Sequence, residues 1–262
     1  DGLLATASRS SVAVEQLVEL AEPFDGSIRH HNYCAFLPAV LATCGLPAFI
    51  NGVHDCGPKH GVTVSKIYKY LGKRELPNMS EAAALLESAD VGWAYCGQEY
   101  TAPALYAIRE QRDLMVKRTA LTTLERLTRP FVATAGKNFL HIGYVHKDYP
   151  AIYAELAARA GYDSVCMIKG LEGGIFPAPD KPIKAELVEI VGAAEPKNIK
   201  LSFDPGDSTL SSSSLKFDAN VSCEAQVTKI AQQGSAALSG AQGNARKMLT
   251  MTGALILCNT GL

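Results

Sequence analysis

Residues 139–174 read FLHIGYVHKDYPAIYAELAARAGYDSVCMIKGLEGG, and they carry the clearest fold signal in the chain. The apolar run 139–145 predicts a strand, and residues 150–160 show the periodicity of a helix that Gly161 closes. Residues 164–168 predict a second strand that runs into a Gly-rich turn. A strand, a helix and a strand within about 30 residues form a right-handed βαβ unit, in which the two strands are parallel.

The rest of the chain extends this unit into an α/β protein, with a mainly parallel sheet and helices on both faces. Helices are expected over residues 1–22, 33–44, 64–71, 80–88, 102–115, 118–128, 221–233 and 244–258. Further strands are expected at 47–50, 92–96, 183–191 and 198–203, and a Ser-rich loop at 204–218. The sequence contains no internal repeat, and the lack of a short period excludes a collagen-like or coiled-coil chain.

The composition narrows the class of protein. The 262 residues include 25 Lys and Arg against 26 Asp and Glu, which gives a net charge of -1 and a pI of about 6.7. Charged residues make up 19% and hydrophobic residues 47%, which excludes a disordered chain. The sequence offers no excess of basic charge for binding nucleic-acid phosphates. The length predicts one large globular domain, or one and a fraction. The low charge suggests that part of the surface is covered by something outside this sequence.

The cysteine pattern and the apolar runs predict an intracellular protein, in the cytoplasm or inside an organelle. Seven cysteines are scattered without a CxxC pair, which favours free, buried thiols in a reducing compartment. A zinc site at His54, Cys56 and His60 has little support from spacing. The longest apolar stretch, 35–50, contains two prolines and is too short to span a bilayer, so no membrane insertion is expected.

Two loops at strand or helix junctions could bind an anion, because ligands of open α/β sheets sit at the carboxyl ends of strands. The first, FDGSIRHHN, leads into a helix and offers backbone N–H groups with polar side chains; the alternative is an ordinary polar turn. Its candidate residues are Asp25, Gly26, Ser27, Arg29, His31 and Asn32. The second loop spans residues 51–63 and could equally be a solvated connector. Its candidates are Asn51, Gly52, His54 and Lys59.

Two further groups of residues complete the candidate site. Glu172 is the carboxylate of the Gly-rich segment after the strand at 164–168, which could let a ligand approach the backbone or could be an ordinary turn. Arg112 and Arg118 belong to a basic cluster that could hold a carboxylate or a phosphate, or could be a solvated face. The sequence shows no Ser-His-Asp order and no HExxH motif, so serine-hydrolase and zincin chemistry have no support.

The order of these segments resembles the large domain of the anthranilate phosphoribosyltransferase family, glycosyltransferase family 3. The matching segments are PFDGS, HNYCAFLPAVLATCG, LPAFINGV, TVSKIYKYLG, KRTALTTLERLTRP, the 141–170 stretch and GNARKMLTMTGALILC. The resemblance implies the phosphoribosyltransferase and nucleoside-phosphorylase-like α/β fold over residues 23–262. Residues 1–22 would then be a connecting helix or a remnant of the family's N-terminal helical domain, which would be mostly absent.

The sequence departs from the family where the family binds phosphoribosyl pyrophosphate. The family's Gly-Thr-Gly-Gly-Asp loop corresponds to Phe24-Asp25-Gly26-Ser27-Ile28, and its Lys-His-Gly-Asn loop to residues 50–53. The family's acidic pair, which holds magnesium, is replaced by Ile175 and Phe176. With these departures the sequence resembles a divergent branch of the family, whose members keep the fold but lack the standard activity and whose bacterial members bind nucleic acids. No cofactor is expected, and magnesium only if transferase activity is retained.

Three functions remain open from the sequence. The first is a protein that has lost the standard magnesium-dependent transfer but binds a phosphorylated or anionic ligand. The second is a non-catalytic interaction protein, which would bind nucleic acid or form part of a larger assembly; the net charge disfavours nucleic acid. The third is an active transferase with another acceptor, using Asp25 and Glu172 as metal ligands. A protein partner or a homodimer is expected on the side of the missing helical domain, with apolar surface at residues 12–21.

Overall fold

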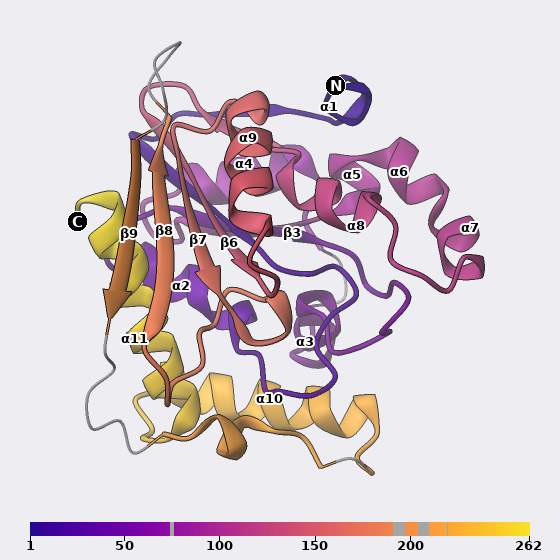
Figure 1. Ribbon diagram of the computed structural model, residues 1–262, viewed down its shortest axis with the longest axis vertical. Helices are drawn as coiled ribbons and strands as arrows, with labels where there is room; N and C mark the ends of the chain where they lie inside the picture. The colour runs from indigo at the N-terminus through magenta and orange to yellow at the C-terminus, as the bar shows by residue number, and fades with distance from the viewer. Residues whose placement is uncertain (74–75, 191–196, 204–209, 219) are drawn as a thin grey trace.

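The computed structural model describes residues 1–73, 76–190, 197–203, 210–218 and 220–262. Within these residues seven strands form one sheet in the order β4-β3-β2-β6-β7-β8-β9 (Figure 1). The five strands in the order β4-β3-β2-β6-β7 pair in parallel, whereas β8 is antiparallel to both of its neighbours, β7 and β9. The strands are β2 (Gln16–Ala21), β3 (Ala48–Gly52), β4 (Trp93–Gly97), β6 (Lys137–Tyr144), β7 (Ser164–Lys169), β8 (Ile183–Glu189) and β9 (Lys197–Phe203). The predicted mainly parallel α/β fold is confirmed.

The helix predicted over residues 1–22 is wrong. Only α1 (Gly2–Thr6) is helical there, and β2 lies inside the sheet, paired with β3 on one side and β6 on the other. Leu17, Val18 and Leu20 are each at most 1% exposed, so the apolar surface expected at residues 12–21 is also absent. A strand buried on both faces is apolar at nearly every position, and such a run satisfies a helical pattern by chance.

Helices cover both faces of the sheet (Figure 1). Val18 and Leu20 of β2 belong to a core with α2 (Leu37–Thr43), α3 (Val64–Tyr70), α10 (Cys223–Leu238) and α11 (Asn244–Thr260). Leu17 and Ala21 belong to clusters with α4 (Met79–Glu87) and α9 (Tyr149–Ala160). Because alternate strand residues point to opposite faces, the two helix groups lie on opposite sides of the sheet.

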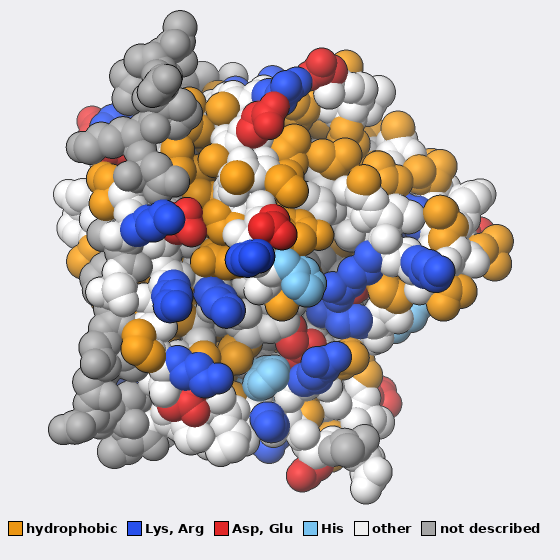
Figure 2. Space-filling view, in the orientation of Figure 1, with side chains coloured by type: hydrophobic (Ala, Val, Ile, Leu, Met, Phe, Trp, Pro, Cys, Tyr) orange, Lys and Arg blue, Asp and Glu red, His pale blue; other side chains and the backbone are white. Residues whose placement is uncertain are grey.

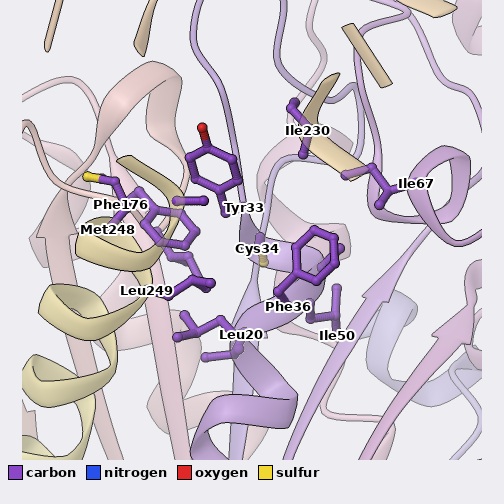
Figure 3. Packing of buried hydrophobic residues seen from close by; sticks show 14 of the residues in the cluster. Leu20, Tyr33, Cys34, Phe36, Ile50, Ile67, Phe176, Ile230, Met248 and Leu249 are labelled. Atoms are coloured by element: carbon purple, nitrogen blue, oxygen red, sulfur yellow. The ribbon is translucent and has the colours of Figure 1, made fainter. Parts of the chain in front are cut away.

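Ile175 and Phe176 are part of the larger core. Their side chains are 0% and 3% exposed, and Phe176 packs near Met248 and Leu249 of α11 (Figure 3). Fully buried apolar side chains of this size are each worth about 1.5–3 kcal/mol of stability. These two positions therefore serve packing, and they offer no oxygen ligand to a metal ion.

Several predicted elements are shorter than expected. The helix predicted at 102–115 is divided into α6 (Pro103–Ala107) and α7 (Arg109–Leu114), and α5 (Gln98–Thr101) precedes them. The segment 118–128 contains α8 (Leu121–Leu124) and the 3-10 turn η2 (Glu125–Leu127), and residues 33–44 begin with η1 (Cys34–Phe36). In the predicted Ser-rich loop, η4 (Ser212–Leu215) is formed and residues 204–209 lie outside the described residues. Residue 191, the end of one predicted strand, also lies outside them.

A small two-stranded sheet was not anticipated from the sequence. It pairs β1 (Ser10–Val12) with β5 (Phe131–Ala133) in parallel, and both strands have only three residues. A run of exposed apolar residues lies elsewhere, at the end of α7 and in the turn after it, where Leu114, Met115 and Val116 are 83%, 59% and 74% exposed. All seven cysteines are free thiols. Over the described part of the chain, no helix combines the length and the apolar character that crossing a bilayer requires.

Glu19, in the middle of β2, carries a testable pH dependence. It is 1% exposed, and burial raises its pKa to about 8, although the Tyr162 hydroxyl donates a hydrogen bond to it. The folded state therefore holds this proton more tightly than the unfolded state, so the contribution to stability is lost as the pH rises toward 8. Relative to Glu19→Gln, the wild type should lose about 2 kcal/mol of unfolding free energy between pH 6 and pH 8.

The measurement is urea unfolding of both proteins at the two pH values. Gln keeps an oxygen for the Tyr162 hydroxyl but does not titrate, and Glu155→Gln serves as the control on an exposed carboxylate. An equal change of stability in the wild type and in Glu19→Gln would show that Glu19 is ionised in the folded protein at neutral pH.

Candidate functional site

A cleft of about 710 Å³ lies at the carboxyl ends of the parallel strands. The loops after β2, β3, β6 and β7 reach it together with the segment that leads into α8. Its lining includes Asp25, Arg29, His30, Lys59, Arg118, Thr119, Arg126, His146, Tyr149 and Glu172. Figure 2 shows Lys, Arg and His side chains gathered on the face where β6 and β7 end. This position is where parallel α/β sheets bind their ligands.

The loop after β2 is fixed by its contacts with the segment before α3. Gly26 has a φ of +73°, and a Cβ there would lie 2.6 Å from the carbonyl oxygen of Val62. The Ser27 N–H donates to that oxygen, and the Val62 N–H donates back to the carbonyl of Ser27, at 3.0 and 2.8 Å. A residue with a side chain at position 26 would collide with this pairing. The pairing leaves the next three N–H groups of the loop free to point at another segment.

Those three N–H groups bind the carboxylate of Glu172. The Ile28 N–H donates to Oε2 at 3.2 Å, and the Arg29 and His30 N–H groups donate to Oε1 at 2.8 Å each. The Nδ1 atom of the His30 ring is also 3.2 Å from Oε1. Burial alone would raise the pKa of Glu172, but these hydrogen bonds and the charge of Lys59 lower it to about 2. The amide groups that suit a bound anion therefore already hold one from the chain itself.

Asp25 and Glu172 are both paired with cations of the cleft. Lys59 Nζ is 3.2 Å from Asp25 Oδ1 and 3.8 Å from Glu172 Oε2, and its side chain is only 11% exposed. Arg118 donates to the other oxygen of Asp25 at 2.8 Å, while half of its side chain remains in contact with solvent. Two cations and two carboxylates thus form one chain of charges along the floor and rim of the cleft.

Arg126 holds the ends of the strands together beneath the cleft. It is 5% exposed, and its guanidinium donates to the carbonyls of Ala21, Gly143 and Gly173 and to the Tyr153 hydroxyl. These acceptors lie at the end of β2, near the end of β6, in the turn after β7 and on α9. One buried side chain therefore sets the relative positions of four elements around the cleft.

Glu22 joins the loop after β2 to the turn after β7. Its oxygens accept from the Ile175 N–H and from Nδ2 of Asn32, both at 2.7 Å, and burial raises the pKa of this carboxyl. The Asn32 Oδ1 atom accepts from the Cys34 N–H at 2.9 Å and so begins the turn η1. Asn32 is therefore used for structure, next to the cleft and not among the residues that line it.

Two of the predicted ligand residues lie in the protein interior instead. Arg112 is 8% exposed and forms a two-pronged ion pair with Glu125, with N–O distances of 2.7 and 3.0 Å. His31 is 3% exposed and packs its ring against Phe217, and burial lowers its pKa to about 4. A neutral, enclosed imidazole and a fully paired guanidinium do not contribute charge to the cleft.

The second loop contributes mainly one residue to the cleft. Asn51 is buried and accepts from the Thr101 hydroxyl at 2.8 Å, while Gly52 ends β3 within the sheet. The Nδ1 atom of His54 lies 3.2 Å from Ser65 Oγ, and His54 does not line the cleft. Of residues 51–63, Lys59 alone lines the cleft. Within the described residues, no group of three His, Cys, Asp or Glu is placed to hold a metal ion.

Several residues that line the cleft were not among the predicted site residues, among them His30, Thr119, Arg126, His146 and Tyr149. A stricter use of the strand-end rule could have found His146 and Tyr149, because they directly follow β6. Arg126 gave no signal, since an arginine in a helical segment is usually exposed. The hydroxyl of Thr119 has no hydrogen-bond partner in the part of the chain that the structure describes.

The fold matches solved structures of anthranilate phosphoribosyltransferase. The enzyme from Thermus thermophilus aligns with a TM-score of 0.70 at 18% identity, over 99% of this chain and 72% of that chain. The Saccharomyces cerevisiae enzyme in complex with PRPP and Mg gives a TM-score of 0.69 at 14% identity, over 99% and 68%. At these identities the likeness establishes the fold alone.

The matches by sequence are more limited. No protein-family profile matches the chain. An uncharacterized protein from Aquifex aeolicus (strain VF5) is 28% identical over 191 residues, which are 71% of this chain and 54% of that protein. The chain thus spans about half the length of this relative.

Proposed function

We propose that the protein binds a phosphorylated or otherwise anionic small molecule in the cleft at the carboxyl ends of β2, β6 and β7. The observation that carries the proposal is that Lys59, Arg118 and the N–H groups of residues 28–30 lie close together around two carboxylates, Asp25 and Glu172. Arginine and lysine supply charge, and consecutive backbone N–H groups supply directed hydrogen bonds to oxyanions. The Saccharomyces cerevisiae enzyme, which has the same fold, was solved in complex with PRPP and Mg, and this supports a phosphorylated ligand.

We further infer that the chain has lost the magnesium-dependent phosphoribosyl transfer for which its structural neighbours are named. Magnesium requires several oxygen ligands, and Ile175 and Phe176 provide none because they are packed in the core. Three carboxylates line the cleft; Asp25 and Glu172 are each paired with Lys59, and Glu125 is paired with Arg112. The hypothesis that Asp25 and Glu172 would act as substitute metal ligands is therefore the weaker one.

Each cleft residue has a distinct part in the proposed binding. Lys59, largely buried between two carboxylates, fixes positive charge at the floor of the cleft. Arg118 is half exposed at the rim of the cleft, so its guanidinium can adjust its position to pair with a ligand phosphate. The unpartnered Thr119 hydroxyl can donate a hydrogen bond to a ligand oxygen. These groups bind and orient an anion, and none of them is placed as a base beside a nucleophile.

The test is calorimetric titration of the protein with pyrophosphate and with phosphoribosyl pyrophosphate, with and without magnesium. We expect binding whose dissociation constant changes less than about threefold on addition of the metal, because protein cations neutralise the ligand charge. Magnesium-dependent turnover of phosphoribosyl pyrophosphate with anthranilate would contradict the proposal and restore a transferase. Steeply salt-dependent displacement of pyrophosphate by single-stranded DNA would assign the cleft to a nucleic acid instead.

A further inference from the structure

We propose that Glu172 occupies the position of a ligand oxyanion in the cleft, and that a multiply charged anion binds by displacing its carboxylate. The inference rests on the proposed function and adds the manner and the selectivity of binding. It follows from three features of the cleft: the set of donors around the carboxylate, the room beside it, and the charges that would remain after it leaves.

The donors around Glu172 are those of an anion site. Three consecutive N–H groups, from Ile28 to His30, point at one carboxylate over distances of 2.8–3.2 Å. The partner is 142 to 144 residues away in the sequence, so this is no local turn or cap. Without Glu172, these N–H groups would face the cleft, which His30 and Arg29 line. A free oxyanion could accept the same hydrogen bonds with the same geometry.

The carboxylate can leave without unfolding the turn that carries it. Glu172 lies in the 3-10 turn η3 (Leu171–Gly173), and its side chain already lines the cleft of about 710 Å³. Rotation of the side chain alone would move the carboxylate into this space. The backbone of Glu172 has a φ of +54°, which is uncommon for a residue with a side chain. This conformation directs the side chain toward residues 28–30, and the carboxylate can still move by rotation about the side-chain bonds. Displacement of the carboxylate therefore requires no change in the backbone of η3.

The positive groups that lose Glu172 as a partner determine how much negative charge a displacing ligand must carry. Displacement separates Glu172 from Lys59 and from the His30 ring, so the incoming anion must interact more strongly with these groups than a carboxylate does. A singly charged anion offers no such gain, and it also lacks the tethering that gives Glu172 a high effective concentration. Pyrophosphate carries more charge and can reach Arg118 as well. The wild-type cleft should therefore reject acetate and accept pyrophosphate.

The experiment compares the wild type with Glu172→Ala and with Glu155→Ala, a control that removes an exposed carboxylate paired with Arg159. In Glu172→Ala, acetate should raise the melting temperature saturably, because it fills the vacated site. Acetate should not do so in the wild type or in the control. Pyrophosphate should bind Glu172→Ala about tenfold or more tightly than it binds the wild type.

A second measurement does not depend on the stability of a variant. In the wild type, titration with pyrophosphate should shift the side-chain carboxylate ¹³C resonance of Glu172 toward its solvent-exposed value, together with the Arg29 and His30 amide resonances. Pyrophosphate binding without movement of the Glu172 resonance would overturn the displacement and leave the proposed function intact. If pyrophosphate does not bind the wild type or Glu172→Ala, the proposed function fails, whereas acetate binding to the variant would still support the site.

Discussion

Arg126→Met is expected to lower the free energy of unfolding by about 4 kcal/mol. The guanidinium is 5% exposed and donates to three backbone carbonyls and one hydroxyl, on four different elements. Met fills a similar volume but has no donor, so the carbonyls of Ala21, Gly143 and Gly173 lose this partner while remaining buried. Each buried polar group left unsatisfied costs about 1–3 kcal/mol.

Urea unfolding followed by circular dichroism measures this effect. The matched control is Arg159→Met, which removes an exposed arginine whose partner, Glu155, is one helical turn away on α9. That change should alter the stability by less than about 0.5 kcal/mol. If the midpoints of the two variants coincide, Arg126 does not hold the strand ends together as the contacts indicate.

The fold could be predicted from the sequence where segments of different kinds alternate. The unit from β6 to β7 was found because β6, α9 and β7 differ in period and are separated by Gly161 and short polar turns. The prediction failed at β2, because both faces of this strand are buried: Leu17 packs on one face, and Val18 and Leu20 pack on the other. Periodicity reports burial on one side of an element, so it cannot identify a strand that lies in the middle of a doubly covered sheet.

The candidate site could be predicted in part, for a similar reason. The sequence singles out loops at strand ends, and Asp25, Lys59 and Glu172 from these loops do meet in the cleft. The sequence does not distinguish the polar residues that line the cleft from those that are paired with one another. Arg112 is satisfied by Glu125, and the loop amides are satisfied by Glu172 across more than 140 residues of sequence. Such pairings depend on the tertiary structure and leave no pattern in the chain.

The net charge was a second sequence argument that the structure changes. A value of -1 describes the whole chain, whereas binding depends on where the charges lie. Lys59 and Arg118 stand together at one cleft, and Figure 2 shows further Lys and Arg side chains on the same face. The cleft is lined by four Lys and Arg residues against three Asp and Glu residues, so a nearly neutral protein can carry a small local excess of positive charge there.

Lys59→Met is expected to weaken pyrophosphate binding on the order of 100-fold. The change has two consequences for the cleft. It removes the cation at the floor, and it leaves Asp25 and Glu172 with less compensation, so that both carboxylates repel the incoming anion. The second consequence is why the loss should exceed that of a single ligand contact. Titration calorimetry at fixed ionic strength measures it, because surface charges are screened by salt.

The control is Lys137→Met, which makes the same change of charge at an exposed position where β6 begins, at the opposite end of the strand from the cleft. Its affinity for pyrophosphate should stay within about twofold of the wild type, since distant exposed charges are screened. Lys59→Arg should keep a substantial part of the affinity, because it retains the charge between the two carboxylates. Equal affinities of Lys59→Met and Lys137→Met would mean that the ligand is held elsewhere, and the anion cleft would then have to be abandoned.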